Sequence, residues 1–423
     1  MKRREFLGAS AGAVGAAWFG SPRPRNTRYG AVWSAIALAA VLGAGPGCGT
    51  SETQALSRGF NACEQEDHPA RLDYHDSVSQ LDHCDEEATF PEGWTLLTNW
   101  GTKPQWLTPT SFVFVSNLIG DVYRMEISTG EIERLTGHFP HAGFTRVHVL
   151  SNDDLLLLGP SSGPQPPLDP LTPYEEGMFD GDLFVLRYPY DGVPLPLNEH
   201  AWEGVAVSRE TLQIAWSTSA APAYSTNPDG SLDAVATLDT LLNEPSEIRT
   251  GTIVYDSESV PRIESTRVVI AKEDVGDVLL EPQDFVGTGE ESLTVSAYGL
   301  SEGFGDGLIV DMAEGTFEGV PHPLGGGFDE WEGVHPDGSS AFIEVVDGTQ
   351  DPAYVDELYL YVYSFDTQEF TRVVDLHPTR PHEPVFSEDG RWALMATVAL
   401  FGHAGYGAGI LLVDMEAALR AQR

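Results

Sequence analysis

The chain has 423 residues, of which 41% are hydrophobic, so it is long enough to bury a substantial core. Its 23 Lys and Arg residues stand against 64 Asp and Glu residues, which gives a formal net charge of −41. A surface of this sign repels nucleic acids and anionic membranes, so we exclude both as partners. It suits cations, basic partners or a salty medium, although solubility at high salt would explain it equally well.

The N-terminus carries the features of an export signal. The basic pair Arg3-Arg4 precedes Phe6-Leu7 and a weakly apolar run that is rich in Gly and Ala. This order resembles the twin-arginine export signal. The resemblance implies that the chain crosses a membrane after it has folded.

A second apolar run, Ala31–Ala44, follows shortly after. It is shorter than the roughly 20 residues of a membrane span and is typical of a signal peptide. Cys48 follows small residues and resembles the acylated cysteine of a lipoprotein signal. We therefore expect residues 1–48 to be the export signal. The mature protein would be a lipoprotein of the periplasm or outer cell envelope, held at the membrane only through Cys48. Plain cleavage nearby and a retained anchor are the alternatives.

Residues 49–90 are polar and acidic, and they predict a tether rather than a folded unit. In an exported chain the two remaining cysteines, Cys63 and Cys84, are expected to form a disulfide. Closing this loop would contribute about 3 kcal/mol in the chain-entropy model. Three histidines lie between or beside the cysteines: His68, His75 and His83. A metal site is therefore the alternative, although the spacing matches no standard zinc pattern.

From residue 91 onward the chain reads as all-β. Phe112–Ser116 and Val122–Ile127 are rich in β-branched and aromatic residues and are separated by turn residues. Related units recur down the chain, and Asp-Gly turns at Asp337-Gly338 and Asp389-Gly390 precede hydrophobic strands. Six such units without long helices predict a six-bladed β-propeller of four-stranded antiparallel blades over residues 91–423.

The last unit supplies only three strands, which end with Ile410–Met415. Trp94–Trp100, just before the first complete unit, is a spare strand that resembles the outer strand of a blade. We expect these two segments to pair and close the ring.

The first unit carries a family pattern. Pro104-Gln105-Trp106, Asp121-Val122-Tyr123, Ser128-Thr129-Gly130 and Arg134-Leu135-Thr136 are similar to the repeat of TolB-like propellers. The resemblance implies a six-bladed periplasmic propeller, usually a scaffold or binding module. The same fold serves as the non-catalytic domain of prolyl-peptidase-like enzymes and, in elaborated form, as oligogalacturonate lyase.

Carboxylates recur near the start of several innermost strands, where a propeller borders its central channel. They are Glu203, Asp284, Glu332 and Glu383, with His382 beside the last and with Gln105 and Arg146 at the related places of the other two units. We expect an acidic ring at the channel mouth that binds a cation or a basic peptide end. The alternative is a set of solvated turn carboxylates in a very acidic chain.

Sequence motifs for catalysis are scarce. The chain has no Gly-x-Ser-x-Gly elbow and no His-Glu-x-x-His motif. His138, His141 and His382 would have to converge to build a metal site, as the lyase resemblance suggests. We therefore expect a monomeric, non-catalytic binding or scaffold protein that needs no cofactor and presents its loops to a protein, peptide or glycan. The alternative function is a metal-assisted polysaccharide lyase or hydrolase on the same ring.

The lipid anchor gives a first test. We expect the mature protein to partition into detergent and to incorporate labelled palmitate, and Cys48→Ser to abolish both. Cys63→Ser is the matched control and should leave labelling unchanged. A wild-type protein that is unlabelled and soluble without detergent would refute the anchor.

Overall fold

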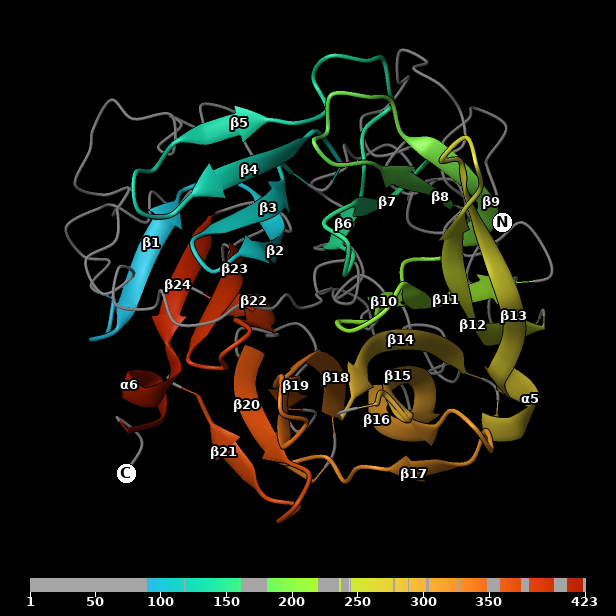
Figure 1. Cartoon of the computed structure of the whole chain (residues 1–423). Helices are drawn as coiled ribbons and strands as arrows, with labels where there is room; N and C mark the ends of the chain where they lie inside the picture. The colour runs from blue at the N-terminus through green and yellow to red at the C-terminus, as the bar shows by residue number, and fades with distance from the viewer. Residues whose placement is uncertain are drawn as a thin grey trace, which may run out of the picture.

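The computed structural model describes residues 90–420, apart from 118, 161–180, 220–235, 237–242, 244, 277, 288, 302–303, 326, 348–357, 374–379 and 399–408. The export signal, the tether, Cys48, Cys63 and Cys84 lie outside the described residues. Figure 1 shows six blades arranged around a central axis, which confirms the six-bladed β-propeller. In every blade four antiparallel strands follow one another from the centre of the ring to its rim.

The first three blades contain strands β2 to β13. Blade 1 consists of β2 (Thr102–Thr108), β3 (Ser111–Val115), β4 (Val122–Glu126) and β5 (Ile132–Arg134). Blade 2 consists of β6 (Arg146–Val149), β7 (Leu155–Pro160), β8 (Gly181–Leu186) and β9 (Leu195–Ala201). Blade 3 consists of β10 (Val205–Val207), β11 (Gln213–Ser219), β12 (Ser246–Tyr255) and β13 (Pro261–Ala271), followed by the short helix α5 (Lys272–Val275).

The other three blades complete the ring. Blade 4 consists of β14 (Leu279–Val286), β15 (Ser292–Ser301), β16 (Phe304–Asp311) and β17 (Phe317–Gly319). Blade 5 consists of β18 (Gly327–Val334), β19 (Ser340–Asp347), β20 (Leu358–Ser364) and β21 (Phe370–Arg372). Blade 6 consists of β22 (Arg380–Phe386), β23 (Trp392–Val398), β24 (Ile410–Asp414) and the N-terminal strand β1 (Trp94–Thr98), and the helix α6 (Met415–Arg420) follows β24.

The expected closure is confirmed. β1 pairs antiparallel with β24, with Trp94 opposite Val413 and Leu96 opposite Leu411. Figure 1 shows the two strands side by side at the seam between the chain's two ends. Leu96 and Leu97 are fully buried there, on opposite faces of the strand, so β1 contributes to the packing of blade 6 on both sides.

The cores lie between neighbouring blades. Four tryptophans are buried in these cores: Trp106, Trp202, Trp331 and Trp392. Both Asp-Gly turns have the conformation that favours glycine, with φ of +71° at Gly338 and +67° at Gly390. The outer strand of blade 3, β13, is eleven residues long. No helix in the described residues is long and apolar enough to span a membrane.

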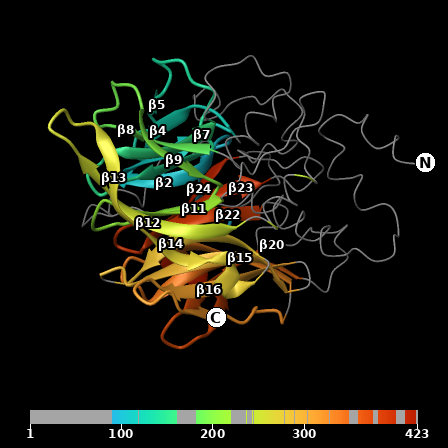
Figure 2. The same cartoon turned by 90° about the vertical axis from the view of Figure 1, so that its right-hand side faces the viewer.

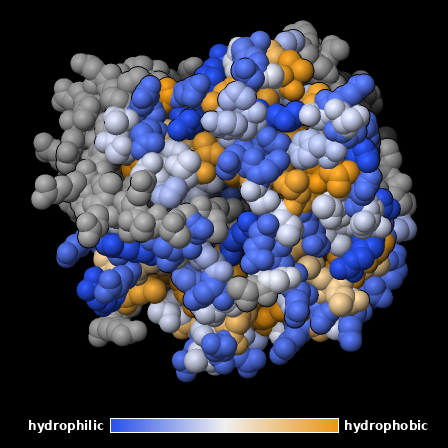
Figure 3. Space-filling view, in the orientation of Figure 1, coloured by the Kyte–Doolittle hydropathy of each residue, from blue (hydrophilic) through white to orange (hydrophobic). Residues whose placement is uncertain are grey.

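Corresponding strands run in the same direction in all six blades. Every first and third strand runs toward one end of the ring, and every second and fourth strand runs toward the other. The innermost strands therefore begin at the same end at which the second strands end and the third strands begin. We call this the long-loop end. Figure 2 shows the ring from the side, with the turn between β12 and β13 projecting from the opposite end. That opposite face is mostly hydrophilic in Figure 3.

Ring closure predicts a large effect of removing β1. A chain that begins at Lys103 loses four buried apolar side chains: Trp94, Leu96, Leu97 and Trp100. At about 1.5–3 kcal/mol each, the loss is on the order of 5–10 kcal/mol, comparable with the whole stability of a typical domain. We expect the urea concentration at the unfolding midpoint to be much lower than that of the wild type. We also expect aggregation through the unpaired edge of β24.

A chain that begins at Ala88 is the matched control and should unfold at the wild-type midpoint. Leu96→Ala is the milder variant and should cost about 2–5 kcal/mol. Full stability of the chain that begins at Lys103 would contradict the closure.

Candidate functional site

Ionisable side chains from all six blades meet on the axis of the ring. The innermost strand of each blade, or the residues just before it, supplies one: Lys103, Arg146, Glu203, Glu281, Glu332 and Glu383. The first four lie at or near the start of their strand, whereas Glu383 is the fourth of seven residues in β22 and Glu332 is the sixth of eight in β18. Glu330 and Glu344 of blade 5 join them, and we call these eight residues the axial cluster. Ion pairs join Lys103 of blade 1 to Glu203 of blade 3, and Arg146 of blade 2 to Glu281 of blade 4. Pairs between non-adjacent blades can form only across the centre.

The local backbone explains why these side chains lie on the axis. Of the six residues that the innermost strands contribute, five directly precede Pro or Gly, as in Lys103-Pro104 and Glu203-Gly204. The strand pairing shifts register at these points, for example between His382 and Val385. Lys103, Glu203 and Glu383 have positive φ values of 55°, 27° and 52°, which are uncommon outside glycine. Such bulges re-aim a side chain, and strained backbone of this kind clusters at functional sites.

Two cations satisfy three of the carboxylates. Arg146 Nη2 donates to Glu203 Oε1 and to Glu281 Oε1, both at 3.0 Å. Lys103 Nζ lies 3.7 Å from Glu203 Oε1 and 3.8 Å from Glu383 Oε1. Glu383 Oε2 also accepts hydrogen bonds from Thr102 Oγ1 at 2.7 Å and from the Lys103 amide at 2.8 Å. On this side of the axis every carboxylate is paired with a cation, although Glu203 Oε2 and Arg146 Nε have no hydrogen-bond partner among the described residues.

Blade 5 supplies three carboxyl groups that have no such cation. Glu330, Glu332 and Glu344 are all 0% exposed, and no ion pair joins any of them to a described Lys or Arg. Glu344 Oε1 accepts the Glu383 amide at 2.7 Å, which leaves Glu344 Oε2 without a partner among the described residues. Neither carboxyl oxygen of Glu332 accepts a hydrogen bond from a described donor. Of the five carboxyl oxygens of the axial cluster that have no described hydrogen-bond partner, four belong to blade 5 and one is Glu203 Oε2.

A shared phenol shows that protons are held here. The Tyr298 hydroxyl lies 2.5 Å from Glu281 Oε2 and 2.7 Å from Glu330 Oε1. A phenol has only one proton to donate, so one of the two carboxyls must itself be protonated. Burial raises the pKa of Glu330 well above its ordinary value, and the Glu281 and Glu344 charges raise it further. Glu330 is therefore the protonated partner.

Burial is the main cause of the other shifts as well. It raises the pKa of Glu281 to about 7, assisted by the Glu203 charge and opposed by Arg146. It raises the pKa of Glu383 to about 7 against the opposing effect of Lys103. The pKa values of Glu332 and Glu344 lie well above the ordinary value because of burial, and Glu344 lies within reach of a hydrogen bond from a protonated Glu332. The blade 5 carboxyls thus bind their protons more tightly than ordinary glutamates do.

The histidines do not converge. His382 is buried, with Nδ1 3.8 Å from Glu383 Oε2, and so lies beside the axial cluster. His138 Nε2 lies 2.7 Å from the Gly192 carbonyl oxygen, and His141 Nε2 lies 3.2 Å from Asp121 Oδ1, both away from the axis. Across the described part of the chain, no three His, Cys, Asp or Glu side chains are grouped closely enough to hold a metal ion.

Of the predicted site residues, Asp284 lies elsewhere. Its Oδ2 accepts from Arg209 Nη2 at 2.6 Å and from the Val334 amide at 2.7 Å, so it joins blades 3, 4 and 5 near the opposite end. Glu281, three residues earlier, takes its expected place. The alternative of solvated turn carboxylates is wrong for Glu203, Glu332 and Glu383, which are at most 2% exposed.

The sequence analysis did not predict several residues of the axial cluster, although the sequence around some of them contains a recognisable pattern. Lys103 and Glu281 each stand directly before Pro near the start of an innermost strand, as Glu383 does. Glu344 is a lone carboxylate in the apolar run of β19, which is a signal of a buried partnered charge. The buried His148 is two residues beyond Arg146 on the same strand, and burial lowers its pKa to about 3.

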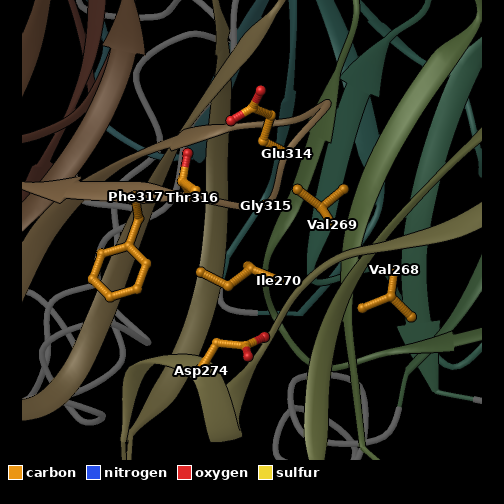
Figure 4. Close-up of a pocket in the computed structure, with 8 residues that line it drawn as sticks. All are labelled: Val268, Val269, Ile270, Asp274, Glu314, Gly315, Thr316 and Phe317. Carbon is orange, nitrogen blue, oxygen red and sulfur yellow. The ribbon is translucent and has the colours of Figure 1, made fainter.

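A groove lies on the rim, between the outer strands of blades 3 and 4 (Figure 4). Its walls include the partly exposed Val268 and Phe317, with Asp274 and Glu314 at its edges. Asp274 Oδ2 already accepts from the Ala271 amide at 3.2 Å. This groove lies between two blades and is separate from the axial cluster.

Comparisons with known proteins reach only the fold. No protein-family model matches this chain, and no curated protein matches it. Solved structures of similar fold include TolB from Acinetobacter baumannii, at 7% identity and a TM-score of 0.42, with 70% of this chain and 59% of that chain covered. The match thus spans less than two thirds of the TolB chain.

Two oligogalacturonate lyases are also similar. One, in complex with manganese, shows 10% identity and a TM-score of 0.42 over 72% of this chain and 74% of that chain. The other, from Vibrio parahaemolyticus, shows 11% identity and a TM-score of 0.44 over 76% of this chain and 93% of that chain. The propeller assignment and the axial cluster rest on this chain's own strand pairing and contacts.

The raised pKa values predict how stability depends on pH. A carboxyl with a pKa of 4.5 when unfolded and about 7 when folded binds its proton more tightly in the folded state. Its stabilisation is complete below pH 4.5 and is lost as the pH rises through 7, on the order of 3 kcal/mol per such group. We expect the free energy of unfolding, measured with urea, to fall as the pH rises from about 5 to 7.5.

Glu332→Gln should flatten this slope, because an amide does not ionise. The control Glu264→Gln removes a carboxylate that is about half exposed, on β13, and should keep the wild-type slope. Surface carboxylates titrate near their ordinary values, below this window. A wild-type stability that rises or stays level between about pH 5 and 7.5 would contradict the raised pKa values of the buried carboxyls.

Proposed function

We propose that this chain is an exported, non-catalytic binding protein of the cell envelope, tethered by an N-terminal lipid. Its binding face is the long-loop end of the ring, and its partner is a protein, peptide or glycan. The observation that carries the proposal is the placement of the long connections. Four of the six segments between second and third strands are long at this end, whereas blades 1 and 4 keep short connections there, 116–121 and 302–303.

The strand ends give the extent of these connections. They span 161–180 in blade 2, 220–245 in blade 3, 348–357 in blade 5 and 399–409 in blade 6. The turns at the opposite end are mostly a few residues long, such as 387–391 in blade 6. Long loops in a compact domain are usually functional, and loops carried on a rigid scaffold are where binding residues concentrate.

The axial cluster supports the same face. Lys103, Arg146, Glu203 and Glu281 lie at or near the starts of their innermost strands, which is the long-loop end. A rigid ring with a charged centre and long loops around it matches the usual form of a binding site, with a few convergent polar groups on a stable scaffold. The described histidines lie too far apart to add a metal-assisted reaction to this description.

Replacing one long connection tests the proposal. In the full chain with a C-terminal affinity tag, residues 161–180 are exchanged for a short Gly-Ser turn. We expect an unchanged unfolding midpoint and at least a tenfold loss of a specific component captured from envelope extracts. The reason is that the loop contributes to the binding face and not to the ring.

The matched control exchanges the turn 256–260, which projects from the opposite end (Figure 2), for the same Gly-Ser turn. Capture should survive this change. Loss of capture in the control but not in the 161–180 variant would place binding at the wrong end and overturn the proposal. Cleavage of acidic polysaccharide by the purified wild-type protein would do so as well, in favour of a lyase or hydrolase.

A further inference from the structure

The charges of the axis are unevenly compensated. Lys103 and Arg146 make all their axial ion pairs with Glu203, Glu281 and Glu383. These residues belong to blades 1, 2, 3, 4 and 6, so blade 5 is the one sector without a paired charge. Its carboxyls are Glu330, Glu332 and Glu344.

An unpaired buried carboxylate is costly, so it is neutralised by a proton or by a bound cation. Glu332 has two fully buried oxygens that accept no hydrogen bond from the described residues, and Glu330 Oε2 and Glu344 Oε2 are in the same position. Among the described residues these four oxygens, supplied by β18 and β19, have no basic side chain, hydroxyl or amide as a donor, although a protonated Glu332 lies within reach of Glu344. Their natural complement is a cationic group with several N–H donors.

Geometry distinguishes the kind of cation. A divalent metal ion needs several oxygens converging at about 2.0–2.6 Å. Within the described residues no three candidate ligands come together in this way. An ammonium group instead has three N–H donors that each reach an acceptor about 2.8 Å away, so it tolerates a wider spacing. Lys103 already lies between two carboxylates of this ring, 3.7 and 3.8 Å from their oxygens.

We propose that Glu330, Glu332 and Glu344 form a binding site for a primary ammonium group on the axis of the ring. The site rests on the proposed binding function and names its ligand class: a small amine, a lysine side chain or a peptide N-terminus. The ammonium occupies in blade 5 the role that Lys103 and Arg146 fill in the other sectors. Its N–H groups supply the donors that Glu332 lacks.

Binding is coupled to proton release. The ionisable groups that face the site come from five strands: Glu330, Glu344, Glu383, Tyr298 and Glu281, with Arg146 farther across the axis. Burial and mutual repulsion keep the blade 5 carboxyls protonated in the absence of a cation. An ammonium stabilises the ionised form, so its binding releases protons to the solvent. Affinity therefore increases as the pH rises from 6 toward 8.

Calorimetric titration of the purified full chain tests the site. The probes are n-butylammonium, Nα-acetyl-lysine amide and glycylglycinamide, which separate a small amine, a lysine side chain and a peptide N-terminus. We expect at least one of them to bind with a stoichiometry of one and to release protons, seen as a heat that depends on the buffer's ionisation enthalpy. Tetramethylammonium has the same charge but no N–H donor, and it should bind at least tenfold more weakly.

Variants locate the binding. Glu332→Gln and Glu344→Gln should each lower the affinity at least tenfold, and the surface variant Glu264→Gln should leave it unchanged. Both core variants replace buried acids by amides of the same shape, and their folding is checked by the unfolding midpoint. If Glu332→Gln fails to fold, Glu344→Gln decides.

Three outcomes would overturn the site: equal binding of tetramethylammonium, equal binding by both Gln variants, or binding of Ca²⁺, Mg²⁺ or Mn²⁺ but of no amine. Capture of an envelope partner through the 161–180 connection is a separate measurement. Its success alongside a failed titration would remove the ammonium site and keep the binding function. The reverse result would keep the site and remove the proposed face.

Discussion

The pairing of β1 with β24 is the contact on which the rest of the structure depends. It joins the two ends of a chain whose other sheets are local, so every other blade is positioned by a ring that this one ladder closes. Closure brings all six innermost strands around one axis. Water is thereby excluded from the centre, and the ionisable side chains there have to satisfy one another.

The axis shows two solutions to that constraint. On one side Arg146 bridges Glu203 and Glu281, and Lys103 lies between Glu203 and Glu383. On the other side, the blade 5 carboxyls have no Lys or Arg partner among the described residues, and we propose that they are neutralised by protons or by a bound cation. A buried charge network seldom adds net stability over an apolar core. The ring is the rigid scaffold, and the axial cluster carries the ionisable groups.

Local signals in the sequence were enough for the architecture. Alternating strands, Asp-Gly turns and the spare segment before blade 1 led to the blade number and the seam, because each depends on neighbours in the chain. The axial cluster was harder, since a one-residue bulge decides which side chain faces the centre. Glu203 and Glu383 stand on such bulges and were found, whereas Asp284 was chosen in place of Glu281. Glu344 comes from a second strand, and only the folded ring reveals its approach to Glu332.

The central claim is that blade 5 keeps neutral carboxylic acids on the axis until a cation arrives. Infrared spectroscopy of the ligand-free protein at neutral pH measures this directly, because a protonated carboxyl has a C=O stretch separate from that of a carboxylate. The account predicts a protonated-carboxyl band at pH 7 that shifts in D₂O and weakens in a variant carrying Gln at positions 330, 332 and 344. A spectrum at pH 7 with no protonated-carboxyl band would contradict it.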